Sequence, residues 1–201
     1  AVSRSCPLTR IGEHLYGKAE QDVRKSDVKQ FDYVDPKNRA VQIEMERAVT
    51  EHLKRVGAWL KPKFKSAKVE EGEFASEASV IIPVKDRVKT VGDAVRSVLK
   101  QQTSFPFNLI VVDNHSTDGT TDLLRSFAQK DKRLVHVIPQ RQDLLIGGCW
   151  NEAVHHPACG RFAVQLDSDD IYSDENTLQK IVDAFRSEQC AMVIGSYRMT
   201  N

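Results

Sequence analysis

The sequence predicts an α/β fold in which a doubly wound, mostly parallel sheet over residues 78–201 follows a helical extension and linker at 1–77. The first observation is a rhythm of short β-branched runs that start every 26–30 residues, the spacing of strand–helix–strand units. The second is that these runs are continuously apolar, as in strands that helices cover on both faces. The expected strands lie at 79–84, 107–112, 133–138, 161–166 and 191–195.

Helices are expected between these strands, and three of them follow residues that commonly cap a helix. Thr90, with Asp93 three residues later, has the spacing of a capping box, and Ser116 and Ser173 precede acidic first turns. Ligands of such sheets bind beyond the carboxyl ends of the strands, so these ends are where we expect a site. The expected helices are 90–101, 118–129, 149–156 and 175–187.

The N-terminal part contains one clear helix, followed by a linker without periodicity at 63–78. Asp35 and Pro36 form a start signal, apolar residues then recur at steps of three and four as far as Leu60, and Lys61–Pro62 predicts the end. The polar face of this helix mixes acidic and basic residues, unlike a helix that lies on a membrane. We therefore expect its apolar stripe to pack against the sheet.

Composition excludes several classes of protein. The chain of 201 residues holds 29 basic and 28 acidic residues, so we expect no basic face for nucleic-acid binding. The longest apolar runs are only a few residues long, far short of the ~20 that a membrane-spanning helix needs. The four cysteines form no CxxC pair, and the N-terminus has no secretory leader. We expect a soluble cytoplasmic protein with free thiols.

Polar and acidic side chains follow three of the expected strands. Those after the second strand can be interpreted as caps of the next helix. After the fourth strand, the carboxylates of Asp167, Asp169 and Asp170 occur within four residues and repel one another unless a cation or hydrogen-bond donors neutralise them. This cluster predicts a site for Mg²⁺ or Mn²⁺ that also holds a phosphate. The three segments are 83–87, 113–119 and 167–170.

Other motifs are absent or weak. The sequence has no phosphate-binding loop of the GxxxxGK[ST] type, no GxGxxG and no GxSxG nucleophile elbow. A zinc site built from cysteines and histidines is disfavoured, because their spacing matches no usual ligand pattern. The residues concerned are Cys149, His155, His156 and Cys159.

Three segments resemble the motifs of family 2 glycosyltransferases of the GT-A fold. They are ASVIIPVKDR, IVVDNHSTDGTTDLL and FAVQLDSDD, which are similar in order and spacing to the family patterns SVIIPxYN, VVDDxSxDxT and xxDxDD. The resemblance covers residues 78–195 and leaves 1–77 outside it. It implies an enzyme that transfers a sugar from a nucleotide-diphosphate sugar to an acceptor hydroxyl with inversion, in polysaccharide biosynthesis.

The resemblance also implies roles for individual residues. The pair after the second strand, here Asp113 and Asn114, meets the edge of the nucleotide base. Asp169 and Asp167 correspond to the DxD pair, with Asp169 as the main ligand of Mn²⁺ or Mg²⁺ and Asp167 also near ribose or sugar hydroxyls. The metal would stabilise the charge that develops on the departing diphosphate. The other donor-binding residues implied are Pro83, Val84, Lys85, Arg87, Ser168 and Asp170.

The sequence departs from the family pattern at three positions. Lys85 stands where an aromatic residue is usual, and Asn114 stands where a second acid is usual. Trp150 takes the place of an arginine near the phosphates, a role for which Arg141 is a candidate.

The catalytic base of the family follows the DxD segment by many tens of residues, so we expect it beyond Asn201 and assign it to no residue here. The chain then corresponds to the donor-binding half of a longer enzyme, with a UDP-sugar as donor and a glycan or other hydroxyl acceptor. We expect it in the cytoplasm, peripheral to the inner face of a membrane. The alternative is a catalytically silent nucleotide-sugar-binding or scaffold module. A nucleotidyltransferase is disfavoured because the loop after the first strand lacks glycine.

Overall fold

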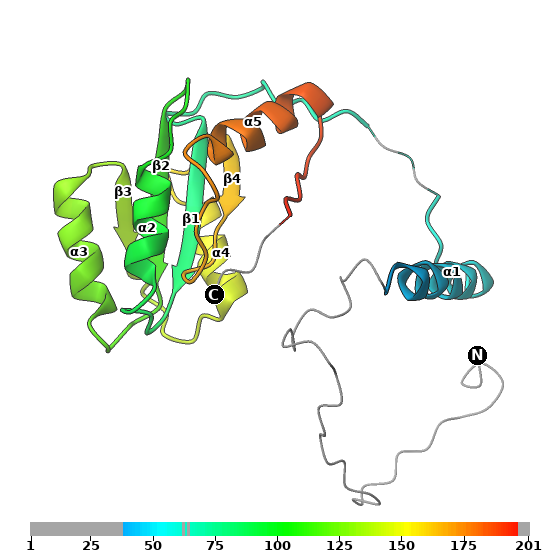
Figure 1. The fold of residues 1–201 in the computed structure, drawn as a ribbon, viewed down its shortest axis with the longest axis horizontal. Coiled ribbons are helices and arrows are strands. Elements are labelled where there is room, and N and C mark those ends of the chain that lie inside the picture. The colour runs from blue at the N-terminus through cyan, green and yellow to red at the C-terminus, as the bar shows by residue number, and fades with distance from the viewer. Residues whose placement is uncertain (1–37, 62, 64, 197–201) are drawn as a thin grey trace, which may run out of the picture. The chain divides into compact units, whose positions relative to one another are not determined.

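The core of the protein is a sheet of four parallel strands in the order β3-β2-β1-β4 (Figure 1). The computed structural model describes residues 38–61, 63 and 65–196. Contacts divide the chain into two units, 1–64 and 65–201, and the sheet belongs to the second. The strands are β1 (Ala78–Val84), β2 (Phe107–Asp113), β3 (Leu134–Val137) and β4 (Phe162–Gln165).

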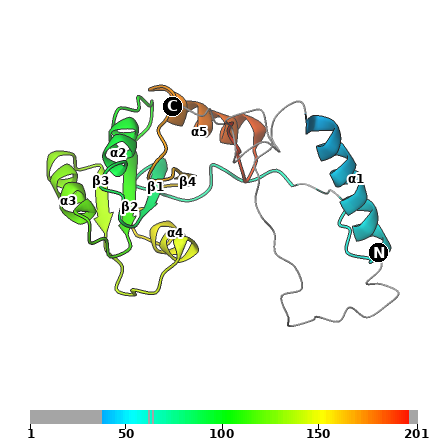
Figure 2. The same cartoon turned by 60° about the horizontal axis from the view of Figure 1, so that its bottom comes forward.

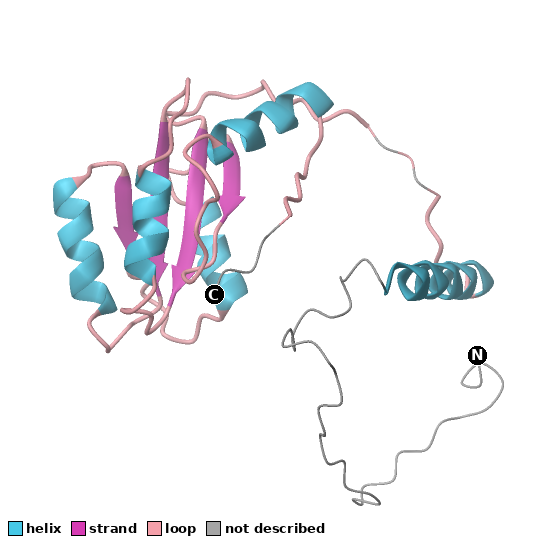
Figure 3. Cartoon of the chain, in the orientation of Figure 1, coloured by secondary structure: helices cyan, strands magenta, loops and turns pink. Residues whose placement is uncertain are grey.

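Helices alternate with the strands along the chain (Figure 3) and cover both faces of the sheet (Figure 2). Three helices pack on one face, where their side chains join β1 and β2 in a large apolar cluster. Helix α4 covers the other face and forms a smaller cluster with the same two strands. The predicted doubly wound α/β fold is therefore confirmed. The helices are α2 (Val91–Leu99), α3 (Thr120–Lys130), α4 (Ile146–Val154) and α5 (Thr177–Glu188).

The continuous apolar runs of β1 and β2 follow from this two-sided burial. Val80 and Ile82 of β1 join the large cluster, whereas Ile81 between them joins the small one. In β2, Val111 and Val112 divide in the same way. Because successive side chains of a strand point to opposite faces, both faces must be apolar when both are covered.

The predicted strand at 191–195 is wrong. A strand needs a hydrogen-bonded neighbour, and no ladder to this segment exists among the described residues. Met192 and Ile194 are 72% and 85% exposed, so their apolar side chains have no core to join. The chain leaves α5 through Gln189, which has a φ of 48° and accepts a hydrogen bond from the N–H of Ala67 (2.7 Å).

The predicted capping box at the start of α2 is also wrong. Thr90 is the N-cap residue, but its side chain makes no cap hydrogen bond and its Oγ1 is buried without a partner. Asp93 pairs instead with Arg96, one turn further along the helix (2.7 Å).

Helix α3 begins two residues later than predicted, after Gly119, whose φ of 100° suits glycine.

The first unit contains the helix α1 (Arg39–Arg55), and no residue of this helix is buried. Its end differs from the prediction: the N–H of Gly57 donates to the carbonyl of Lys54 and the N–H of Ala58 to that of Leu53, a Schellman motif with a Gly57 φ of 72°. The predicted start at Asp35 lies outside the described residues. Packing of the apolar stripe on the sheet stays a prediction, and no described helix is long and apolar enough to cross a membrane.

The segment at 65–77, interpreted from the sequence as linker, belongs to the second unit. Arg161, next to β4, donates to the carbonyls of Glu71 (2.6 Å) and Gly72 (2.9 Å). Arg186 of α5 donates to the Glu77 carboxylate (2.7 Å). Two partly buried arginines thus hold this segment against the amino end of β4, which places the division at 64/65 rather than at 77/78.

Gly160 provides a test of how closely this segment packs. A Cβ at Gly160 would lie 2.8 Å from the Ser76 carbonyl oxygen and 2.9 Å from the Ala78 carbonyl carbon, and both are backbone atoms. Gly160→Ala should therefore lower the free energy of unfolding by about 1–3 kcal/mol in urea titrations. The matched change Gly147→Ala meets nothing within 4 Å and should leave stability unchanged or raise it. Equal stability of the two variants would refute the close packing.

Candidate functional site

Three loops begin side by side at the carboxyl edge of the sheet. Val84 and Asp113 are register partners at the ends of β1 and β2. Leu166, the first residue after β4, still donates its N–H to the carbonyl of Ile81 in β1 (3.1 Å). The sheet therefore brings the three predicted segments, from distant parts of the sequence, to one edge (Figure 1).

Asp86 joins the loop after β1 to the loop after β2. Its N–H donates to Ser116 Oγ (2.9 Å), and its Oδ1 accepts from the N–H of Thr117 (2.7 Å). Asp86 has a φ of 53°, a left-handed conformation that costs a non-glycine residue free energy. The cross-loop hydrogen bonds maintain this conformation, so the two loops form one structure.

Asp118 and Thr120 add a second set of bonds between the same loops. Val88 donates its N–H to Asp118 Oδ2 (3.0 Å), and Arg87 donates its N–H to Thr120 Oγ1 (2.9 Å). Hydrogen bonds from Thr120 and Val88 lower the pKa of Asp118. Asp118 was expected only to cap α3; it also fixes the loop after β1.

Asp113 is a fully buried carboxylate at the end of β2. Oδ1 accepts from the N–H of Ser116 (2.9 Å), whereas Oδ2 accepts from Thr121 Oγ1 and lies 3.4 Å from His136 Nε2. Burial by itself raises the pKa of Asp113, but these hydrogen bonds outweigh it and hold the pKa far below its ordinary value. Both oxygens are occupied by the protein, so the contacts support a structural role more than direct contact with a base.

Asn114 is buried next to Asp113 but, unlike Asp113, has a side-chain oxygen without a hydrogen-bond partner. Its Nδ2 donates to the carbonyl of Leu144, in the loop before α4, and its Oδ1 has no hydrogen-bond partner. Since a carbonyl can only accept, the amide nitrogen must face Leu144 and the oxygen must face away from it. His115, with a φ of 59°, adds a second link to this loop through Nε2 and the carbonyl of Arg141 (3.1 Å).

The acidic segment after β4 presents charge without compensation. Ser168 is buried, Asp167 is half-buried, and Asp169 and Asp170 are exposed. None of the three carboxylates makes an ion pair with a described residue. Burial and the charges of Asp167 and Asp169 raise the pKa of Asp170. In the described part of the chain no three acidic, histidine or cysteine side chains are arranged to hold a metal ion.

The residues predicted to line the base and ribose differ in how exposed their side chains are. The Val84 side chain is part of the large cluster, and its carbonyl accepts the N–H of Asn114 (2.8 Å), so it has little to offer a ligand. Pro83 is half-buried. Lys85 and Arg87 are exposed, and neither pairs with a carboxylate in the described residues.

Two residues at departures from the family pattern have other partners. The Arg141 guanidinium binds the Asp143 carboxylate (2.8 Å) on an exposed loop. Trp150 packs against the smaller apolar cluster beneath α4. The structure therefore brings neither side chain to Asp167–Asp170 in a contact among the described residues.

The sequence did not reveal which side chains hydrogen-bond to the buried Asp113 carboxylate. Thr121 was counted only as part of a helix, and His136 lies inside the apolar run 133–138. A histidine within such a run was the available signal, since a buried imidazole needs a polar partner.

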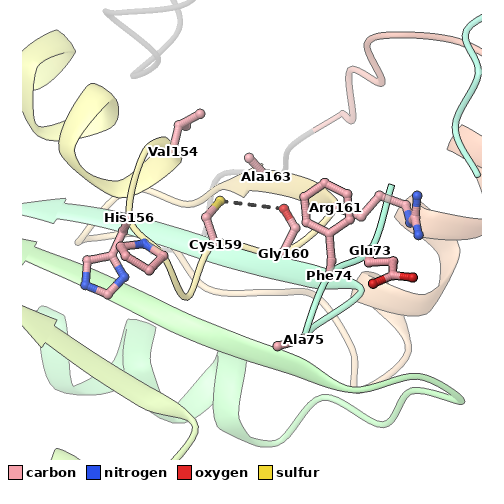
Figure 4. Close-up of a pocket in the computed structure, with 10 residues that line it drawn as sticks. Glu73, Phe74, Ala75, Val154, His156, Cys159, Gly160, Arg161 and Ala163 are labelled. Carbon is pink, nitrogen blue, oxygen red and sulfur yellow. Dashed lines mark hydrogen bonds between the residues drawn. The ribbon is translucent and has the colours of Figure 1, made fainter. Parts of the chain in front are cut away.

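A cavity of about 460 Å³ lies at the opposite, amino-terminal side of β4 (Figure 4). None of the predicted site residues lines it. The Arg161 guanidinium there lies over the Phe74 ring and already donates to backbone carbonyls of the 65–77 segment. Its lining includes Glu73, Phe74, Val154, His156, Cys159 and Arg161.

Comparisons with known proteins identify the family of the second unit. The family model described as "Glycosyl transferase family 2" matches residues 79–201. The chain is 34% identical over 122 residues to the "Putative teichuronic acid biosynthesis glycosyltransferase TuaG" of Bacillus subtilis (strain 168), covering 60% of this chain and 46% of that protein. It is 30% identical over 123 residues to the "UDP-Glc:alpha-D-GlcNAc-diphosphoundecaprenol beta-1,3-glucosyltransferase WfgD" of Escherichia coli, covering 61% and 46%. The chain thus spans less than half the length of either relative.

Among solved structures, the chain is similar to S. aureus TarS 1-349 in complex with UDP-GlcNAc. The TM-score is 0.48 at 28% identity, and the match covers 55% of this chain and 31% of that one.

The buried Asp113 carboxylate predicts a pH-dependent stability. Asp113→Asn removes the charge that three donors surround and should lower the free energy of unfolding at neutral pH by about 2–3 kcal/mol. Folding lowers the pKa of Asp113, so this stabilisation is complete above the unfolded pKa of about 3.9 and is lost as the pH falls below it. The difference in the free energy of unfolding between wild type and Asp113→Asn, measured by urea titration, should therefore decrease in acid.

The matched control is Asp122→Asn, which removes an exposed carboxylate from α3. It should change stability by less than about 0.5 kcal/mol at either pH. Two results would show that Asp113 does not stabilise the edge as an anion. One is a small difference in the free energy of unfolding between wild type and Asp113→Asn at neutral pH; the other is a difference that does not decrease in acid.

Proposed function

The chain belongs to glycosyl transferase family 2, and from this premise we propose that the second unit binds a nucleotide-diphosphate sugar and takes part in transferring its sugar to an acceptor hydroxyl with inversion. The observation that carries the proposal is the meeting of three polar loops at the carboxyl edge of the sheet, where ligands of doubly wound sheets bind. The relatives whose names include glycosyltransferase activity support the same reaction class.

We propose that Asn114 reads the base of the donor. Its amide nitrogen is held by Leu144, so the side chain offers only an acceptor, the unpartnered Oδ1. An acceptor suits bases with a ring N–H at this edge, as in uracil. In cytosine the ring nitrogen at that position is itself an acceptor, so it forms no hydrogen bond with Oδ1. A base that donates to Oδ1 while the bond to Leu144 remains would complete the hydrogen bonding of a buried atom. Asp113 supports this contact by fixing the end of β2.

Lys85 and Arg87 extend the proposed donor site along the loop after β1. Both are exposed and free of carboxylate partners in the described residues, so they are available to the ribose and phosphates. Pro83 lies half-buried at the same strand end, whereas the side chain of Val84 is in the core and its carbonyl accepts the N–H of Asn114.

The acidic segment fits a divalent cation by its chemistry. Hard carboxylate oxygens without counter-charges gain from a cation. Partial burial of the carboxyl group, and then the charges of Asp167 and Asp169, raise the pKa of Asp170. Mn²⁺ or Mg²⁺ would be held by Asp169 with Asp167, the remaining ligands coming from phosphate and water, since no three described ligand groups converge. A bound cation would neutralise the charge of the leaving diphosphate. Asp170 and buried Ser168 orient the donor sugar beside it.

The proposed acceptor is a glycan or another hydroxyl compound, and the relative from E. coli is named for a lipid-linked one. We assign no catalytic base to a described residue. The proposed location is the cytoplasm, at the inner face of a membrane.

Base selection tests the role of Asn114. In calorimetric titrations with Mn²⁺, UDP-sugars should bind more tightly than CDP-sugars by about 1–3 kcal/mol, the value of one hydrogen bond plus an unsatisfied partner. GDP- and dTDP-sugars complete the series, because their bases also carry a ring N–H. Asn114→Ala should remove most of this preference while the protein keeps its melting transition. Equal binding of UDP- and CDP-sugars by wild type would disprove base reading at this site.

Metal dependence tests the acidic segment. Asp169→Ala should reduce Mn²⁺-dependent UDP-sugar binding at least about tenfold, because removing a charged ligand costs more than about 1.4 kcal/mol. Asp169 is exposed at a strand end, so the variant should fold normally. Asp183→Ala, which removes an exposed carboxylate of α5, is the matched control and should bind as wild type does. Unaltered metal-dependent binding in Asp169→Ala would exclude Asp169 from the site.

A further inference from the structure

The last turn of α1 and the stretch that follows it have a charge unlike the rest of the chain. Between Glu51 and Glu70 the sequence contains six lysine or arginine residues and no acidic residue, whereas the whole chain has a net charge of only +1. The rest of the polar face of α1 mixes both signs, so the excess begins in the last turn of the helix, at Lys54 and Arg55. The six residues are Lys54, Arg55, Lys61, Lys63, Lys65 and Lys68.

The structure shows that this stretch also exposes apolar side chains. After the turn at Gly57, the ring of Trp59 lies 4.9 Å from Lys54 Nζ and remains 39% exposed. Leu60 is 88% exposed. Lys61 and Lys63 are exposed and form no ion pair with a described residue. The end of the first unit therefore presents a tryptophan, a leucine and two unpaired lysines. We name these residues, with Lys54 and with Arg55, which pairs with Glu51 (3.0 Å), the basic turn: Lys54, Arg55, Trp59, Leu60, Lys61 and Lys63.

We propose that the basic turn binds the surface of an anionic lipid bilayer. Lysine and arginine are attracted to anionic headgroups, tryptophan favours the headgroup region, and an exposed leucine gains by entering the acyl boundary. A nucleic acid would use the same positive charges but would gain nothing from Leu60. Water alone leaves Leu60 and Trp59 unfavourably exposed. A lipid surface is the partner that uses all of these side chains.

This inference deepens the proposed function, because it would keep the donor site beside a lipid-linked acceptor. Lipid binding can nevertheless be measured without donor or acceptor. Failure of one proposal therefore leaves the other standing.

The test uses the whole chain and sedimentation with vesicles, either of phosphatidylcholine alone or of phosphatidylcholine mixed with phosphatidylglycerol. The wild type should bind the mixed vesicles, with weaker binding at high salt, and should not bind phosphatidylcholine alone. Lys61→Gln with Lys63→Gln should lower the partition coefficient about 25-fold, since each charge contributes about fivefold. The matched control, Lys130→Gln with Lys132→Gln, removes two exposed lysines of the second unit and should bind as wild type does.

Fluorescence gives an independent readout. The emission of the wild type should shift to the blue on anionic vesicles, and Trp59→Phe should abolish this shift while Trp150 still emits. The proposal is overturned by equal binding to both vesicles, by equal losses in the two lysine double variants, or by tighter binding to an RNA homopolymer than to anionic vesicles. The circular dichroism spectrum and melting transition of Lys61→Gln with Lys63→Gln should match those of wild type, which shows that the variant is folded.

Discussion

The carboxyl edge of this protein depends on the cost of burying one negative charge. Asp113 is removed from water at the end of β2, and a buried carboxylate is tolerated only when donors surround it. The donors come from three different places: the loop after β2, the first turn of α3 and the middle of β3. Satisfying the charge therefore fixes these elements relative to one another. The loop after β1 is then bonded to the fixed loop through Asp86.

The distribution of satisfied and unsatisfied polar groups differs between the two edges of the sheet. At the amino edge, Arg161 and Arg186 find carbonyl and carboxylate partners within the unit, and Arg186 Nε is the one atom of the two guanidinium groups that is buried without a hydrogen bond in the described structure. At the carboxyl edge, the Asn114 oxygen has no partner and the carboxylates of Asp167–Asp170 have no counter-charge among the described residues. Natural proteins leave few buried polar groups unpaired, so the Asn114 oxygen indicates where a ligand can complete the structure, and the exposed carboxylates of Asp169 and Asp170 lie at the same edge. This contrast supports a ligand site at the carboxyl edge.

The sequence was sufficient for features that depend on periodicity and insufficient for features that depend on contacts. Four of the strands and the two-sided burial follow from continuous apolar runs such as that around Ile81. The predicted strand at 191–195 has the same composition, but pairing decides whether such a run becomes a strand. The Thr90–Asp93 spacing predicted a cap, yet Arg96 competes for the carboxylate. The end of α1 was placed at Pro62 because proline is the more familiar signal, although Gly57 supplies the left-handed residue that a Schellman motif needs.

The attachment of residues 65–77 to the sheet bears on how such a unit can be exchanged between proteins during evolution. The Arg161 guanidinium makes three contacts with this segment. It donates to the carbonyl of Glu71, lies over the ring of Phe74 and pairs with the carboxylate of Glu77. A recombination event that joined a new N-terminal partner at residue 78 would leave that arginine without its partners and uncover the amino end of β4. A junction before Lys65 keeps all of these contacts. The unit that must be transferred intact is therefore longer than the segment that carries the family motifs, and its first residues are held in place by packing.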